Sequence, residues 1–338
     1  TNGYQPVNTS TATLTSMPML DIPQVVNTVS EQVLQDQHAT NLDEALYNVA
    51  NVVQTNTLGG TQDAFTRRGF GANRDGSIMT NGLRTVLPRS FTAATERVEV
   101  LKGPASTLYG ILDPGGLINV VTKRPERTFG GSVSATSTSF GGGTGRFDVT
   151  GPIDGTPLAY RVIGEYQHED YWRNFGKEKS SFINPSLTWF GERATVNVSY
   201  SHRNYSTPFD RGTIFDLNTG HAVNVDRKTR FDEPFNITDG YSDLAQLNAE
   251  YRLSDAWTAR FDYSYSQDHY NDDQARVMAY DSATGNLTRR VDATHGSTQK
   301  MHSSRADLQG NVVIGGFYNE ILTGLAYENY DLLRTDKI

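Results

Sequence analysis

From about residue 129 onward, apolar and polar side chains alternate along the chain with a period of two. In one segment Ala245, Leu247 and Ala249 share a face, while Gln246 and Asn248 occupy the other. This period predicts β-strands with one apolar and one hydrated face. We expect about nine such strands, at residues 129–141, 144–153, 158–171, 181–190, 194–205, 242–253, 257–270, 300–314 and 318–331.

The connections between these strands alternate between short and long. The long ones are expected at about 171–180, 206–241 and 270–300. Short turns on one side and long loops on the other are typical of outer-membrane barrels. A water-soluble sandwich would also alternate, but the charged polar faces and the Tyr and Trp residues near strand ends favour a barrel with a hydrated lumen.

Residues 17–125 have a different pattern, typical of a small α/β domain. Leu42, Ala45, Leu46 and Val49 fall on one face of a short helix that Thr40 or Asn41 can cap. Two short strands are expected, one around Val98 and Val100 and one from Leu117 to Thr122. Pro104 suits the start of a one-turn helix that ends near Gly110.

The number of strands raises a question of completeness. Bacterial barrels have an even number of strands, and transporters with a plugged lumen use about 22. Nine strands could not close around a domain of over a hundred residues. We therefore expect an open arc, which belongs to a protein about twice as long.

Composition excludes several functions. The 338 residues carry a net charge of −8 and contain no Cys, and the mean hydropathy is −0.52. The acidic balance argues against nucleic-acid binding. No apolar run approaches the ~18 residues of a transmembrane helix. The seven His residues lack metal-ligand spacing, so we predict no catalytic site, no resident metal and no cofactor.

Two loops carry related sequences that invite a calcium interpretation. They read Asp216-Leu-Asn-Thr-Gly and Asp281-Ser-Ala-Thr-Gly. Both lack the distal Glu and the ligand count of a calcium loop. We interpret them as tight turns closed by Asp and Gly.

The most specific motifs lie in the N-terminal part. Arg68-Gly69-Phe70, then the run from Asn81 to Arg84, then the run from Glu96 to Pro125 follow one another in order. In order and spacing they resemble the plug of TonB-dependent outer-membrane siderophore receptors, and the subgroup they resemble most is that of ferrichrome and ferric-hydroxamate receptors.

The resemblance implies a mainly β fold, with an N-terminal α/β plug domain inside an antiparallel transmembrane β-barrel. On this basis we expect a flexible segment at 1–16, the plug at 17–125 and the first part of a truncated barrel at 129–338. The implied location is the outer membrane of a Gram-negative bacterium, with the protein a monomer surrounded by outer-membrane lipid.

The implied function is active uptake of a ferric siderophore, with a hydroxamate such as ferrichrome as the transported ligand. In this family a TonB box near the N-terminus pairs with TonB by strand addition. We identify no such box, and we expect it upstream of Thr1. Two alternatives remain open: a passive porin or structural barrel, and a barrel that anchors a surface enzyme or adhesin.

Six residues are candidate ligand contacts. The resemblance points to Arg68, whose counterpart in ferrichrome receptors contacts ligand, and less directly to Arg89 and Phe91 in a second apical loop. Strand parity adds Tyr171, Tyr205 and Tyr270, which should lie at outer strand ends and point inward. Their phenols combine apolar area with a hydrogen-bonding tip, and the alternative is a role in packing against plug or lipid. A bulge near a strand end would reverse the parity.

Overall fold

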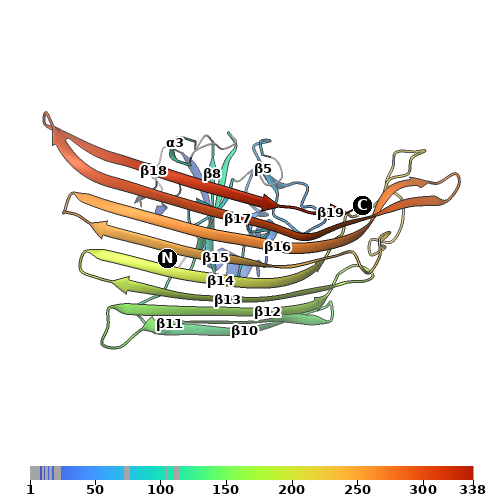
Figure 1. Ribbon diagram of the computed structural model, residues 1–338, viewed down its shortest axis with the longest axis horizontal. Helices are drawn as coiled ribbons and strands as arrows, with labels where there is room; N and C mark the ends of the chain where they lie inside the picture. Colours follow the sequence, from blue (N-terminus) through green and yellow to red (C-terminus); the bar gives the residue numbers. More distant parts are fainter. Residues whose placement is uncertain are drawn as a thin grey trace.

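The wall of the molecule is one curved antiparallel sheet. The computed structural model describes residues 8–9, 11, 14, 17–18, 24–71, 77–103, 106–109 and 114–337. Nine strands follow one another in chain order across the sheet (Figure 1). They are β10 Gly130–Thr138, β11 Gly142–Pro152, β12 Leu158–Asp170, β13 Lys177–Phe190, β14 Ala194–Pro208, β15 Ile237–Arg252, β16 Trp257–Asp281, β17 Asn286–Ile314 and β18 Phe317–Leu333.

All nine predicted strands are therefore present in the part of the chain that the structure describes. A short tenth strand, β19 (Asp336–Lys337), pairs with the upper part of β17. The order runs from β10 at one edge to β18 at the other, and these two strands do not pair with each other in the described residues. The sheet is an open arc.

The prediction of a long loop at residues 270–300 is wrong. β16 and β17 continue as a paired hairpin from Asp272 opposite Thr294 to Asp281 opposite Asn286. Register shifts after Tyr270 and after Val277 interrupt the ladder. The extension alternates only over a short stretch, where Ala275 and Val277 flank Arg276, and the register shifts break its parity with the rest of β16.

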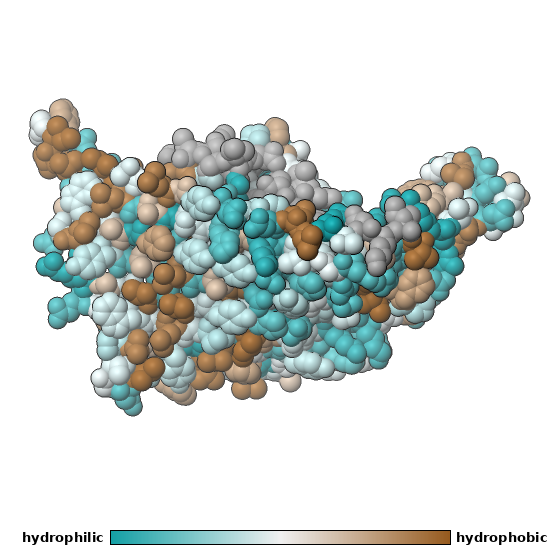
Figure 2. All heavy atoms as spheres, viewed as in Figure 1, coloured by the Kyte–Doolittle hydropathy of each residue, from teal (hydrophilic) through white to brown (hydrophobic). Residues whose placement is uncertain are grey.

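The outward face of the wall is apolar over the half that ends in short turns. Leu187, Val198, Phe261 and Leu325 all point outward and are 40–83 % exposed. Figure 2 shows apolar residues gathered over this half, while hydrophilic residues cover the half that carries the loop after β14 and the long hairpin.

A row of polar side chains marks where this apolar region ends, on the side of the long connections. Register places His202, Asp243, Gln267 and Lys300 side by side on the outward face. His202 Nδ1 lies 2.7 Å from Asp243 Oδ1, and Tyr200 donates to the same oxygen at 2.6 Å. A transition from apolar to polar at one level is typical of the interface of a membrane barrel.

The N-terminal part forms a separate small sheet inside the arc. Its order is β3-β8-β9-β6-β7, with β6 and β9 parallel and the other pairs antiparallel. The bounds of the elements here are β1 Asn8–Thr9, β2 Met17–Pro18, β3 Val25–Val29, α1 Glu31–Asp36, α2 Leu42–Leu46, β4 Val52–Gln54, β5 Phe65–Arg67, β6 Ile78–Thr80, β7 Leu83–Arg84, β8 Thr95–Lys102, α3 Ser106–Tyr109 and β9 Gly116–Thr122.

The predicted local elements of this part are confirmed. Asn41 caps α2 by accepting from the Glu44 amide at 2.9 Å, and the Glu44 carboxylate accepts from the Thr40 amide at 2.7 Å. Strands β8 and β9 fall where the alternation indicated. Helix α3 is present, while Pro104 and Gly110 lie outside the described residues.

Its apolar core joins α2 to the small sheet. Leu42 and Leu46 pack with Val98, Val100 and Ile118, and all five side chains are at most 2 % exposed. Burial of this kind supplies most of the free energy that holds a short helix in place, because an isolated helix of five residues is unstable.

Two residues of the segment expected to be flexible are held in place. Thr9 and Thr11 are buried, and both hydroxyls donate to the carboxylate of Glu99, the Thr9 hydroxyl at 2.5 Å. Tyr109 also donates to the Thr11 carbonyl at 2.6 Å. At Thr9 and Thr11 these contacts differ from the flexibility that we expected for residues 1–16.

The small domain binds the inward face of the wall through polar contacts and through a small apolar cluster that joins Ala93 and Ala94 to Ile163 and Phe182. Asn81 and Gly82 form the two-residue turn between β6 and β7, both with positive φ, as a hairpin of this length requires. At this turn the Asn81 amide donates to the Gln246 side chain at 2.7 Å. Further along, the Val86 amide donates to Ser266 at 3.0 Å, and Lys123 pairs with Asp148 at 3.1 Å.

None of the helices in the described ranges is long enough and apolar enough to cross a membrane.

We predict that Leu46→Ala will loosen the small domain. A buried Leu replaced by Ala costs about 2–5 kcal/mol, so amides of β8 and β9 should exchange faster in hydrogen–deuterium exchange followed by mass spectrometry. Tyr47→Ala is the matched control, because the Tyr47 side chain is 86 % exposed. Equal exchange in the two variants would contradict the assigned core.

Candidate ligand-binding cavity

Three of the six candidate residues meet in one cavity between the small domain and the wall. The cavity has a volume of about 160 Å³. Arg89 and Phe91 line it from the small domain, and Tyr205 lines it from β14. Its other lining residues are Thr40, Asn41, Gly60, Thr61, Pro88, Gln167, Glu178, Lys179, Ser180, Arg203, Ser206 and Thr207.

Tyr270 lies beside this cavity at the same level of the wall. Register places Tyr205 opposite Gly240 and Gly240 opposite Tyr270. Both tyrosines are buried, at 8 % and 5 % exposure, so the parity argument put them on the correct face. Gly240 leaves the space between them: a Cβ there would meet the His269 carbonyl at 2.1 Å and the Tyr205 hydroxyl at 3.0 Å.

The Tyr205 hydroxyl has a defined partner. It donates to Asp268 Oδ1 at 2.8 Å, across Gly240, and Asp268 is only 1 % exposed. This hydrogen bond fixes the Tyr205 phenol at the cavity wall, so a bound molecule would meet an ordered aromatic side chain.

Arg89 is held by acidic residues of its own domain. Its guanidinium lies 3.1 Å from Asp63 and 3.7 Å from Asp43, and it also donates to the Gly60 carbonyl. Burial raises the pKa of Asp43 to about 6, against the opposing effect of the Arg89 charge. Protonation of Asp43 near neutral pH would thus change the charge next to Arg89.

A second arginine in the cavity was missed in the sequence. Arg203 stands two residues before Tyr205 and shares its parity, so the same argument that selected Tyr205 could have found it. Its guanidinium carbon lies 5.5 Å from the centroid of the Tyr205 ring, a distance at which the cation and the ring face attract each other.

A larger cavity of about 490 Å³ lies between the small domain and the last strands of the arc. Asp63, Arg67 and Arg84 line it from one side, with Asp268 and Glu328 among the wall residues. Arg67 is buried, and its guanidinium donates to the carbonyls of Phe65 and Gly116 at 2.9 and 3.0 Å, so it holds the local chain together.

Arg68 lies apart from these cavities. It is exposed, has a positive φ of 50°, and donates its backbone amide to the Asn51 carbonyl at 2.9 Å. The lining of the two cavities above does not include it. The structure therefore does not bring Arg68 together with Tyr205.

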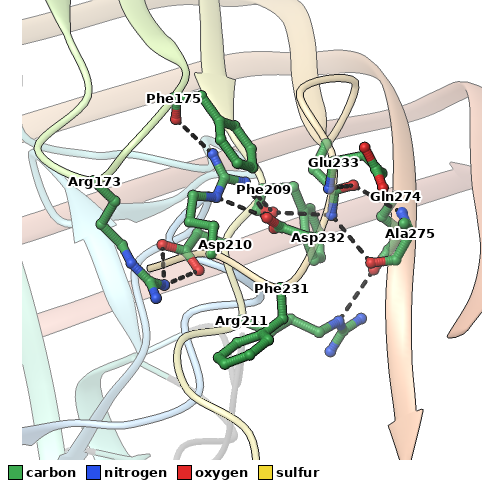
Figure 3. A network of polar contacts seen from close by, with 12 residues as sticks. Arg173, Phe175, Phe209, Asp210, Arg211, Phe231, Asp232, Glu233, Gln274 and Ala275 are labelled. Carbon is green, nitrogen blue, oxygen red and sulfur yellow. Dashed lines mark hydrogen bonds and ion pairs between the residues drawn. The ribbon is translucent and has the colours of Figure 1, made fainter. Parts of the chain in front are cut away.

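Tyr171 also lies apart, in a network of the outer loops. Its hydroxyl donates to Asp210 at 2.9 Å, and Arg173 donates to both oxygens of that carboxylate at 2.7 and 2.8 Å (Figure 3). Burial opposes ionisation of Asp210, but the hydrogen bonds from Arg173, Gly212 and Tyr171 outweigh it and lower the pKa. Nearby, Arg230 pairs with Asp232 at 2.7 Å and covers the Phe175 ring at 4.4 Å.

This loop network contacts the small domain at Gly59. Phe209 is 1 % exposed and packs against Gly59, where a Cβ would meet the ring at 2.7 Å. The Asp210 amide donates to the Gly59 carbonyl at 2.9 Å. The loop after β14 and the segment before β5 are thus coupled through a glycine.

The two Asp-containing loops are turns, as predicted. Gly220 donates its amide to the Asp216 carbonyl and Gly285 to the Asp281 carbonyl, both at 2.8 Å. The turns also bind each other, since Ser282 donates to the Asp216 carboxylate at 2.8 Å. Within the described ranges no group of three or more His, Asp or Glu is placed to hold a metal ion.

Comparison with known proteins identifies the small domain. Residues 18–117 match the family described as TonB-dependent Receptor Plug Domain. The chain is 30 % identical to the metal-pseudopaline receptor CntO of Pseudomonas aeruginosa, over 97 % of this chain and 46 % of that protein. It is 26 % identical to the ferrioxamine B receptor of Salmonella typhimurium, over 95 % and 47 %.

Solved structures agree with this fold. The open form of the ferric-catecholate import receptor Fiu from Escherichia coli K12 superposes with a TM-score of 0.82 at 25 % identity, over 93 % of this chain and 50 % of that one. The chain thus carries a TonB-dependent receptor plug domain next to β-strands, and siderophore receptors are among its homologues. It spans about half the length of the curated relatives it matches.

We predict that Gly59→Ala will detach the outer loop from the plug domain. The new methyl group would displace Phe209 and strain the Asp210 hydrogen bond, so the Asp210 amide should exchange about two- to tenfold faster. Gly60→Ala is the matched control, because Gly60 also has a positive φ but has open space around it. A similar change in both variants would show that backbone strain alone is responsible.

We predict a pH dependence from Asp43. The raised pKa means that the folded state binds a proton more tightly than the unfolded chain, so this stabilisation is complete below about pH 4 and is lost as pH rises through about 6. Asp43→Asn should flatten the pH dependence of amide protection in the plug, which is the exchange rate relative to that of an unfolded chain, between pH 4.5 and 7. Asp154→Asn, in an exposed turn, should leave it unchanged, and an unaltered profile in Asp43→Asn would refute the assignment.

Proposed function

We propose that this chain is the plug and first nine barrel strands of an outer-membrane receptor for TonB-dependent uptake of a ferric siderophore. The observation that carries the proposal is a plug domain bound to the polar inward face of a wall whose outward face is apolar. A soluble sandwich would have no reason to place its apolar face outward against solvent.

The proposed barrel is completed by strands beyond this arc. Each unpaired backbone group at the edges β10 and β18 would cost several kcal/mol in hydrocarbon, so the arc needs further strands to be stable in a membrane. The relatives, about twice as long, are consistent with such strands. We propose a monomer surrounded by outer-membrane lipid, with TonB as its protein partner.

The proposed ligand site is the cavity of Arg89, Phe91 and Tyr205, with Tyr270 beside it. Tyr171 is a proposed contact from the outer loops, where it lines a separate cavity of about 460 Å³ with Trp172 and Asp210. Arg68 rests on family resemblance alone.

Two ligand classes compete for this site. A hydroxamate such as ferrichrome is supported by the sequence resemblance and by the similarity to a ferrioxamine B receptor. An anionic chelate is favoured by the two arginines that line the cavity, Arg89 and Arg203. Receptors named for catecholate siderophores and for metal-pseudopaline are also relatives.

The proposal can be tested by iron-limited growth of a host that lacks its own siderophore receptors. The complete receptor should restore growth on a suitable ferric siderophore only when TonB is present. Growth without TonB would indicate a passive porin. Failure to restore growth on all siderophores, with the receptor present in the outer membrane, would favour an anchored enzyme or adhesin.

We predict that Tyr205→Ala will weaken siderophore binding by the complete receptor up to about tenfold, because one hydrogen-bonding and packing side chain is lost. Isothermal titration would measure this. Tyr200→Ala is the control, since Tyr200 is on the same strand but points outward, where its hydroxyl binds Asp243. Equal affinities of Tyr205→Ala and the parent would remove Tyr205 from the site.

A further inference from the structure

Within the described residues, Arg203 is an arginine of the wall that forms no ion pair, and the charges of Glu165 and Asp63 act on it only from beyond ion-pair distance. Its neighbours on the inward face are Phe182 on β13 and Ser242 on β15, neither of which is charged. In the part of the chain that the structure describes, no carboxylate forms an ion pair with Arg203, and its guanidinium lies over the Tyr205 ring.

The next carboxylates along the same row already bind other groups. Glu165, beyond Phe182, accepts from Arg146 at 2.5 and 2.8 Å. Asp268, beyond Ser242, accepts from Tyr205. Both carboxylates are therefore already hydrogen-bonded, and neither lies within ion-pair distance of Arg203.

The rest of the cavity does not neutralise this charge either. Arg89 lines the same cavity with a second guanidinium, and Asp63 offsets that charge from the plug side. Glu178 is the acidic residue of the lining; its charge interacts with both arginines, but it forms an ion pair with neither at a distance up to 4.0 Å. A guanidinium that is half-buried without a counter-ion carries a desolvation cost, which an anion in the cavity would offset.

Ferric chelates differ in charge, and this difference decides which of them suits the cavity. A tris-hydroxamate complex of iron(III) is neutral, because each hydroxamate carries one negative charge. A tris-catecholate complex carries three negative charges, because each catecholate carries two. Charge-assisted hydrogen bonds from a guanidinium to oxygen anions are about twice as strong as neutral ones.

We propose that Arg203 selects for an anionic ferric chelate, one anionic arm of which enters the cavity between Arg89 and Arg203 against the Tyr205 ring. This inference rests on the proposed function and specifies its ligand class. The volume of about 160 Å³ fits an arm of the chelate rather than the whole complex.

The test compares two probes of opposite class on the complete receptor in detergent. These are the iron(III) complex of a tris-catecholate such as enterobactin, and neutral ferrichrome. Arg203→Gln should weaken binding of the catecholate about ten- to a hundredfold and change ferrichrome binding less than threefold. Arg203→Lys keeps the charge and should retain most of the catecholate affinity, which separates loss of charge from loss of fold.

Arg260→Gln is the matched control. Arg260 also points inward, but it pairs with Glu250 at 3.0 Å and donates to Gln309, away from the cavity. It should alter neither affinity. Equal losses for both probes in Arg203→Gln, no loss for the catecholate, or binding of ferrichrome alone by the parent would overturn the inference while leaving siderophore uptake in place. Binding of no ferric siderophore at all, in these assays and in the growth assay, would instead refute the proposed function.

Discussion

The structure depends on the alternation of side chains between the two faces of a β-strand. Because the period is two, each wall strand must present one face outward and the other to the plug domain. Outward positions such as Leu247 and Phe261 are apolar. Inward positions such as Gln246 and Ser266 are polar and supply hydrogen bonds to the plug backbone and side chains. A slip of one residue in register would exchange these faces and remove the plug contacts together with the apolar surface.

The plug domain and the outer loops are coupled through few but specific contacts. The plug binds the wall by polar side chains, which can exchange partners at modest cost, and by a small apolar cluster of Ala93 and Ala94 with Ile163 and Phe182. Its own core is apolar and closely packed. At the end of the wall that carries the long loops, Gly59 packs against Phe209 and accepts a hydrogen bond from the Asp210 amide. The Asp210 carboxylate accepts hydrogen bonds from Tyr171 and Arg173. A shift of the segment before β5 would therefore be transmitted to the loop network.

The sequence allowed the strands and the local plug elements to be predicted, because each has a clear period or a clear capping residue. Parity also placed Tyr205 and Tyr270 on the inward face. It could not place Tyr171, because that residue lies one position beyond the end of β12, where the chain leaves the sheet and the loop contacts decide its direction. The hairpin extension of β16 and β17 was missed because its apolar alternation is short and is interrupted by register shifts after Tyr270 and after Val277.

Arg203 shows a different limit of sequence reasoning. Its parity was readable, but its importance depends on which carboxylates lie across the neighbouring strands and which of them already have partners. Which carboxylates lie near Arg203 is decided by the pairing of β12 with β13, β14, β15 and β16, strands that together span more than a hundred residues. For Arg68 the motif predicted a ligand contact, but this residue does not line the cavity of Tyr205.

The same register also relates the cavity to the level of the membrane. The outward polar row of His202 and Asp243 marks where the apolar surface ends, and Arg203 and Tyr205 follow His202 by one and three residues on β14. At about 3.3 Å per residue, the cavity begins at this level and extends outward from it. In the proposed orientation Arg203 therefore lies where water and ligand can reach it from outside, and its charge need not be buried beside hydrocarbon. A site at this height can meet an anion before the plug has to move, which is the order of events that uptake through a plugged barrel requires.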